Sequence, residues 1–186
     1  FRLTDPKVKV IVPSMGDYAN RLFAAVLGKL GIQGIALPIA DGEVLRQGRG
    51  VTTCKECLPM IVCIGSMLNY IEKHKAPDEK LVVFQPRAAG YCRLGQYHVY
   101  MNMLIRERQM EDVALMALAN EERYAGLGPA FALNAWKAIV TSDVLDDIRN
   151  TIYAIAEDRE QGLAILEEEI IKISDVFSGK TKKPLY

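Results

Sequence analysis

The sequence predicts an α/β fold: an open, mainly parallel sheet of about four strands, with helices on both faces and a helical extension towards the C-terminus. Three observations predict it. Short runs rich in β-branched residues recur along the first two thirds of the chain. Stretches with a helical spacing of apolar residues separate these runs, and beyond residue 129 the pattern remains helical. Strands that alternate with helices are typical of βαβ units, in which the strands are parallel.

The first βαβ unit lies near the N-terminus and spans about 30 residues. Residues 8–13 (VKVIVP) are rich in β-branched side chains, which is typical of a buried strand. In residues 18–30, Leu22 and Val26 recur at a spacing of four, which predicts a helix. Residues 32–38 (IQGIALP) then predict a second strand, parallel to the first.

The middle of the chain adds two further strands. The expected elements are a glycine-rich loop with one helical turn at 39–53, a helix at 58–74, a strand at 81–86 (LVVFQP), a helix at 91–108, a weaker strand at 112–118 and a polar loop at 120–128. This succession predicts a Rossmann- or flavodoxin-like sheet with the strand order 2-1-3-4. Ligands of such sheets bind at the carboxyl ends of the strands where the order reverses, here between the first and third strands.

The last third of the chain is expected to be helical. Helices are predicted at 129–142, 143–156 and 161–177. Asp143 is a candidate N-cap of the second helix, and Trp136 is expected to pack in the core. We divide the chain into a cysteine-bearing α/β core (1–128), C-terminal helices that pack on it (129–178) and a frayed tail (179–186), and we expect it to be one domain of a longer protein.

The composition restricts the classes of function. The 186 residues include 23 basic and 23 acidic side chains, so the formal net charge is zero and no field attracts nucleic acid. No apolar run reaches the ~18 residues of a membrane span, and the first residues show no signal peptide. We therefore expect a cytoplasmic protein without membrane partners, in a reducing compartment where clustered cysteines bind metals or act in redox chemistry.

The four cysteines mark the candidate site. Cys54 and Cys57 form a C-x-x-C pair just before a predicted helix, and Cys92 lies in the first turn expected for the next one. Both helix starts are expected at the ligand-binding edge of the sheet. A helix N-terminus favours the thiolate over the thiol, and its N–H groups suit an anionic cluster. Cys63 lies within an apolar helix, so we interpret it as a core residue.

The spacing alone leaves several roles open. One C-x-x-C pair is half of a zinc ribbon, which needs two, and the pair also occurs in thiol-redox proteins. Buried cysteines can instead act as small apolar side chains. Arg49 and Arg93 flank the cysteines and are candidates for binding a phosphate-bearing ligand or balancing the charge of a cluster, with a solvated rim as the alternative. No glycine-rich nucleotide loop of known pattern is present.

Two cysteine segments resemble a known family. GRGVTTCKECLPMIVCIGSML resembles the G-(K/R)-x-x-x-x-x-x-E-C-x-P-x-I-x-x-x-G segment of the 2-hydroxyacyl-CoA dehydratase-like proteins and of the large proteins fused to their ATP-dependent activases. PRAAGYCRLGQYHVYMNMLI resembles the P-x-x-x-G-x-C-R-x-G-Q-Y segment of the same family. YAGLGPAFALNAWKAIVTSDVLDDI resembles the segment after its fourth strand, so the resemblance extends over residues 8–148.

The resemblance implies an iron–sulfur function. Members of the family bind a 4Fe–4S cluster or a double cubane through cysteines at such positions, and an ATP-hydrolysing activator passes low-potential electrons to it. The cluster serves reductions or radical dehydrations of CoA thioesters. Carried over by position, Cys57 and Cys92 are the expected ligands. Cys54 is the local candidate for a third ligand, although the family pattern often lacks a cysteine there.

The expected function is therefore an iron–sulfur cluster-binding domain in ATP-driven, low-potential electron transfer. Its expected partners are a separate or fused activase and a CoA thioester or another small substrate, and a homo-oligomer is compatible with the sequence. No activase ATP motif is present, so this segment would receive electrons; whether it is itself an enzyme stays open. The alternative is a non-catalytic α/β module that binds a ligand or partner and has structural or zinc-binding cysteines.

Overall fold

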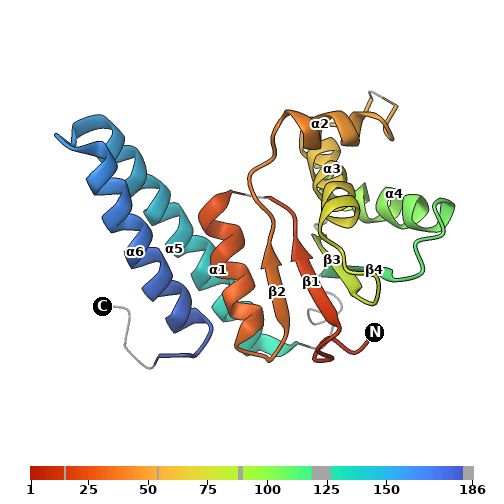
Figure 1. The fold of residues 1–186 in the computed structure, drawn as a ribbon, viewed down its shortest axis with the longest axis horizontal. Coiled ribbons are helices and arrows are strands. Elements are labelled where there is room, and N and C mark those ends of the chain that lie inside the picture. Colours follow the sequence, from red (N-terminus) through yellow and green to blue (C-terminus); the bar gives the residue numbers. More distant parts are fainter. Residues whose placement is uncertain (15, 54, 88–89, 119–126, 182–186) are drawn as a thin grey trace.

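The computed structural model describes residues 1–14, 16–53, 55–87, 90–118 and 127–181. In these residues the centre of the fold is a sheet of four parallel strands (Figure 1). The strands are β1 (Val8–Val12), β2 (Gln33–Ala36), β3 (Lys80–Pro86) and β4 (Val113–Leu118). Their order is β2-β1-β3-β4. The predicted α/β class, the parallel pairing and the strand order 2-1-3-4 are therefore confirmed.

Helices cover both faces of this sheet (Figure 1). Those of the described residues are α1 (Asp17–Gly28), α2 (Gly42–Arg49), α3 (Leu58–Lys73), α4 (Leu94–Glu107), α5 (Gly128–Ile155) and α6 (Arg159–Phe177). One face carries α1, α5 and α6, and the other carries α3 and α4, with α2 packed on α3. The C-terminal helix α6 is joined to α1 by a salt bridge, in which Arg21 Nη1 donates to Glu167 Oε2 at 2.8 Å.

The strands divide the apolar side chains between two cores. On β1, Val10 and Val12 point towards the helices α1, α5 and α6, whereas Ile11 points towards α3 and α4. On β3, Phe84 and Val83 are divided in the same way. This division follows from the alternation of side chains along a strand. Because both faces are covered, the central strands are apolar at almost every position, as the β-branched runs of the sequence predicted.

The helices α2 and α3 cross at an unusually short distance, which two glycines permit. A Cβ atom added to Gly65 would lie 2.0 Å from the carbonyl oxygen of Val44, and one added to Gly48 would lie 2.1 Å from that of Ile61. Any side chain at either position would collide with the backbone of the facing helix. This crossing fixes the glycine-rich region before Cys57 against the start of α3.

The helix α5 differs from the prediction. It runs without a break through the predicted boundary at Ser142 and Asp143, so the predicted cap at Asp143 was wrong. Ser142 is buried, and its hydroxyl donates to the carbonyl oxygen of Ile139 within the helix. Serine and aspartate at this point therefore do not end the helix, because the helix stays packed on the core across them.

The expected packing of Trp136 in the core was also wrong, because its side chain is 65% exposed. The buried side of α5 consists of Phe131, Ala135, Ala138, Ser142 and Leu145. The opposite side exposes Leu133, Trp136, Val140, Val144 and Ile148. Since both sides are largely apolar, the spacing of apolar residues does not reveal which one faces the core.

Among the described residues, no helix is both long and apolar enough to cross a membrane.

Candidate cysteine site

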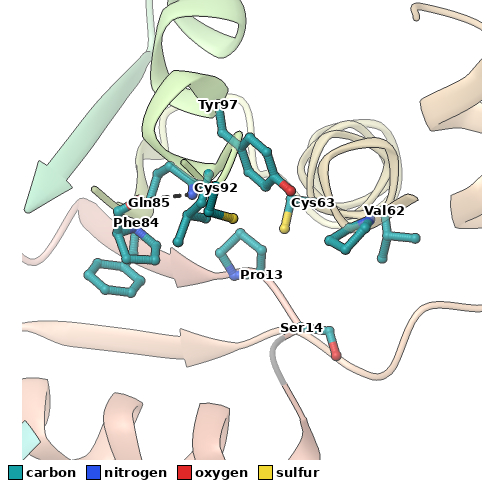
Figure 2. Close-up of a pocket in the computed structure, with 11 residues that line it drawn as sticks. Pro13, Ser14, Val62, Cys63, Phe84, Gln85, Cys92 and Tyr97 are labelled. Atoms are coloured by element: carbon teal, nitrogen blue, oxygen red, sulfur yellow. Dashed lines mark hydrogen bonds between the residues drawn. The ribbon is translucent and has the colours of Figure 1, made fainter. Parts of the chain in front are cut away.

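A pocket of about 310 Å³ lies at the carboxyl ends of β1 and β3, between α3 and α4 (Figure 2). This is the reversal point of the strand order, where the sequence predicted the site. The pocket is lined mainly by apolar atoms, with few polar groups. Its lining consists of Pro13, Ser14, Pro59, Val62, Cys63, Phe84, Gln85, Pro86, Cys92, Leu94 and Tyr97.

Cys57 is the N-cap residue of α3, as its position before Pro59 predicted. Its carbonyl oxygen accepts hydrogen bonds from the N–H groups of Met60 and Ile61, at 3.0 and 3.2 Å. The side chain forms no capping bond. Its half-buried sulfur instead lies 2.7 Å from the hydroxyl oxygen of Tyr97 on α4. The helix start thus holds the sulfur next to the positive end of the α3 dipole.

Cys92 lines the pocket from the segment before α4. The expectation that it lies in the first helical turn was wrong, because α4 begins at Leu94 and Arg93 is its N-cap. Cys92 is exposed, and Figure 2 shows its sulfur at the pocket. Cys92 thus lies two residues before α4, where it is accessible to a bound group and to solvent.

Cys63 lies deeper, on the pocket-facing side of α3 (Figure 2). Its burial raises the pKa of the thiol to about 11, to which the nearby charge of Cys57 contributes. Cys63 is buried, as its interpretation as a core residue predicted. The sequence did not show that its sulfur also lines the pocket.

Tyr97 is the residue around which the described cysteines gather. Its ring is almost completely buried, and its hydroxyl contacts Cys57. Burial raises the pKa of Tyr97 most, followed by the hydrogen bond with Cys57 and by the charges of the three described cysteines. The hydroxyl contacts Cys57, and Tyr97 lines the same pocket as Cys63 and Cys92. The hydroxyl keeps its proton throughout the neutral range and is available as a hydrogen-bond donor.

Two hydrogen bonds tie the segments that carry Cys57 and Cys92 to each other. Arg93 Nη1 donates to the carbonyl oxygen of Lys55 at 2.8 Å. The hydroxyl of Tyr100 donates to the carbonyl oxygen of Val51. Both bonds connect the loop before α3 with residues of α4 or its N-cap, which lie 38 and 49 residues further along the chain. Arg93 was predicted to bind a ligand or balance a charge, and in the structure its guanidinium holds this loop.

Glu56 organises the loop itself. Its carboxylate accepts hydrogen bonds from the N–H and hydroxyl groups of Thr53, at 2.9 and 3.0 Å, and from the N–H of Lys55 at 3.2 Å. Desolvation raises the pKa of this carboxyl, but the hydrogen bonds that it accepts outweigh desolvation and lower the pKa below its ordinary value. The glutamate before Cys57 thus shapes the turn that presents the cysteine.

The two other predicted site residues are Cys54 and Arg49. Cys54 lies outside the described residues. Arg49 ends α2 with an exposed side chain and is not part of the pocket lining. Sequence reasoning missed Tyr97 and Gln85. Tyr97 could have been recognised from its position five residues after Cys92, on the apolar side of the predicted helix. Gln85 could have been recognised as a polar side chain within the apolar run of β3.

The described cysteines are not part of a group of side chains that could hold a single metal ion. Among the side chains that the structure describes, no three or more His, Cys, Asp or Glu are grouped so that they could hold one metal ion. Thiolates around a cluster bind different iron atoms, so they lie farther apart than the ligands of one ion. Cys63 and Cys92 line one pocket, and Cys57 contacts Tyr97, which lines the same pocket.

Comparisons of the chain with models of protein families, with curated proteins and with solved structures return no match.

Proposed function

We propose that this chain is an iron–sulfur cluster-binding domain that acts in ATP-driven, low-potential electron transfer. The proposal follows the resemblance of its cysteine segments to the 2-hydroxyacyl-CoA dehydratase-like proteins and the activase-related proteins. Cys57 and Cys92 are the proposed ligands, with Cys54 as the candidate for a third. Cys63 lines the same pocket and is a further candidate.

One observation carries the proposal: thiols from two segments about 40 residues apart gather at the reversal point of the sheet. Cys57 contacts Tyr97, while Cys92 and Cys63 line the pocket that Tyr97 also lines. Structural cysteines that only fill the core have no reason to gather at a ligand-binding edge. The largely apolar lining also suits a cluster, because a dry environment and hydrogen bonds to sulfur set its potential.

The chain's own contribution would be to ligate the cluster, to orient it and to exclude water. A bound cluster would supply one-electron transfer at low potential. The start of α3 would stabilise the negative charge on Cys57 through its dipole. The exposed position of Cys92 leaves the site open towards an electron donor. We propose an ATP-dependent activase as that donor, and a CoA thioester or another small molecule as the electron acceptor or substrate.

Anaerobic reconstitution with iron and sulfide tests the proposal. We expect wild-type protein to turn brown and to hold about four irons per chain, as one cubane requires. Cys57→Ala and Cys92→Ala are expected to lose most of the iron and the visible absorption. A matched control is Ser66→Ala, which changes a buried side chain of α3 outside the pocket lining. Its iron content is expected to stay at the wild-type level.

Two results would overturn the proposal: wild-type protein that stays colourless, or Cys57→Ala and Cys92→Ala proteins that keep the full iron content. Loss of iron from Cys63→Ala would instead add Cys63 to the ligands.

A second candidate function is a non-catalytic module that binds a small molecule. It is favoured by the pocket itself, because an apolar cavity with few polar groups is typical of small-molecule sites. The same experiment separates the two functions. Colourless wild-type protein that binds stoichiometric zinc, or that is stabilised against heat by small ligands, would support the binding module and its structural or zinc-binding cysteines.

A further inference from the structure

A buried tyrosine hydroxyl needs a hydrogen-bond partner, and for Tyr97 that partner is a thiol. The Tyr97 hydroxyl lies 2.7 Å from the sulfur of Cys57, although the tyrosine is only 3% exposed. In the free thiol either atom can donate the proton. A ligating cysteine is a thiolate and has no proton to give, so in a loaded site the phenol is the donor. Hydrogen bonds to a charged acceptor are among the stronger ones in proteins.

The position of this donor is fixed by the packing of α4. Tyr97 shares the buried side of the helix with Met101, Leu104 and Ile105, and all four belong to the core between α4, α3 and the sheet. The hydroxyl therefore does not belong to a mobile side chain on the surface. It is carried on a packed helix, and Cys57 is held at the start of the facing helix. The two atoms meet because both helices are packed on the same face of the sheet.

The surroundings make this hydrogen bond effective. The pocket next to it is lined largely by prolines, leucine, valine and phenylalanine, and Figure 2 shows the Tyr97 hydroxyl pointing towards Cys63. In such a low-dielectric environment a hydrogen bond is electrostatically stronger than in water. Hydrogen bonds to cluster sulfurs are one of the factors that set the reduction potential, because they stabilise the more negative, reduced state.

We propose that Tyr97 is a positioning residue that donates a hydrogen bond to the Cys57 thiolate and thereby raises the reduction potential of the bound cluster. This inference rests on the proposed iron–sulfur function. Reduction adds one electron to the cluster, supplied by the activase or in the test by dithionite. No bond forms or breaks in this step, and the phenol keeps its proton.

Tyr97→Phe tests the inference, because it removes the hydroxyl and keeps the ring. The matched control is Tyr100→Phe: it removes a hydroxyl from the same helix, one that donates to the backbone of Val51 and not to a thiol. Each full-length protein is reconstituted anaerobically and titrated with dithionite while the signal of the reduced cluster is followed by electron paramagnetic resonance. Iron content and circular dichroism are measured on the same samples.

We expect Tyr97→Phe to keep its iron and to have a more negative midpoint potential than wild type. A tenfold change in the equilibrium between the oxidised and reduced cluster corresponds to about 59 mV for one electron. Tyr100→Phe is expected to keep the wild-type potential. Should Tyr97→Phe not fold, Tyr97→Met decides in its place, because methionine also lacks the donor and adapts to irregular space.

Different results overturn different claims. Iron-loaded Tyr97→Phe with the wild-type potential overturns the inference about Tyr97 and leaves the cluster function intact. Equal shifts in Tyr97→Phe and Tyr100→Phe also overturn it, since the change would then come from the loop and not from the thiolate. A folded Tyr97→Phe protein without iron overturns it as well, because the hydroxyl would be needed for ligation. Wild-type protein that takes up no iron overturns the proposed function, and the inference with it.

Discussion

Lys9 and Glu79 form an ion pair at the end of the sheet opposite the pocket. Lys9 Nζ lies 2.5 Å from Glu79 Oε2, and the hydroxyl of Tyr70 donates to Glu79 Oε1 at 3.3 Å. The carboxylate is only 4% exposed, whereas the lysine side chain is 31% exposed. A buried carboxylate needs such partners, because burying an unpaired charge is costly. The pair therefore joins β1 to the residue before β3 at a position where a lone carboxylate would destabilise the fold.

We expect Lys9→Met to lower the free energy of unfolding by about 3 kcal/mol, the lower end of the range for breaking a buried pair. The methionine leaves the Glu79 carboxylate buried with one partner fewer. Urea unfolding measures the loss. Lys7→Met is the control, because the pair of Lys7 with Asp78 is exposed (63% and 75%), and its loss is expected to cost less than about 1 kcal/mol. Equal effects of both substitutions would contradict this account.

The same pair has a predictable dependence on pH. The hydrogen bond with Glu79 raises the pKa of Lys9 above its ordinary value of 10.5, against the opposing effect of desolvation. A raised pKa in the folded state contributes stability below the unfolded-state pKa, and this contribution is lost as the pH rises through the folded-state value. The difference in stability between wild type and Lys9→Met is therefore expected to be constant around pH 8 and to narrow above pH 10.5.

At the scale of elements, the backbones of α2 and α3 cross so closely that no side chain fits between them at Gly48 and Gly65. Gly65 and Gly48 leave space only for hydrogen atoms between the two backbones. Since α3 carries both Cys57 and Cys63, a displacement of α2 would be transmitted directly to the cysteine site. The glycines of this region do not mark a flexible nucleotide loop; they allow two helices to touch.

Gly65→Ala is expected to destabilise the protein by about 3 kcal/mol, at the upper end of the range for overpacked cores. The added methyl group would meet the carbonyl oxygen of Val44, which cannot move aside as a side chain could. Gly42→Ala serves as the control, because it lies at the start of α2 with no atom within 4 Å of the added Cβ. Its stability is expected to stay within about 1 kcal/mol of wild type. Thermal unfolding of both variants decides, and a Gly65→Ala protein as stable as wild type would refute the close crossing.

Sequence patterns predicted the elements well where one physical signal dominated. The β-branched runs at β1 and β3 predicted buried strands, and their alternation with helices predicted the strand order 2-1-3-4. The continuity of α5 could not be predicted, because Ser142 and Asp143 favour a helix start in isolation and only tertiary packing overrides that preference. The position of Cys92 before α4 was missed for a similar reason: a helix boundary in sequence is uncertain by a few residues.

At the scale of the whole molecule, α5 presents a second apolar side to solvent. Trp136 is the single tryptophan of the chain and lies on this exposed side. Its fluorescence therefore reports directly on whether the side is covered. We expect an emission maximum close to that of free tryptophan in water, and efficient quenching by acrylamide. A blue-shifted, poorly quenched emission would contradict the exposure of Trp136 in the isolated chain; the measurement is repeated at several protein concentrations to detect self-association.

The location of the site was predictable at this scale, but its internal contacts were not. The strand order alone assigns a ligand to the edge between β1 and β3, and the cysteine segments fall at that edge. Tyr97 and Glu56 were missed because their roles depend on contacts between segments far apart in sequence, such as that between Tyr97 and Cys57. The side chain of Arg93 had two candidate roles from its charge. Its bond to a backbone carbonyl could not be read from residue type.

The hydrogen bonds from Arg93 and Tyr100 to the loop before α3 involve only protein atoms. They hold the two cysteine segments together whether or not anything is bound between them. A zinc finger, by contrast, unfolds when its metal leaves. If the site holds an oxygen-sensitive cluster, loss of the cluster does not by itself unfold the protein. A chain that loses its cluster to air would remain folded, and it could be repaired by inserting a new cluster instead of being degraded and synthesised again.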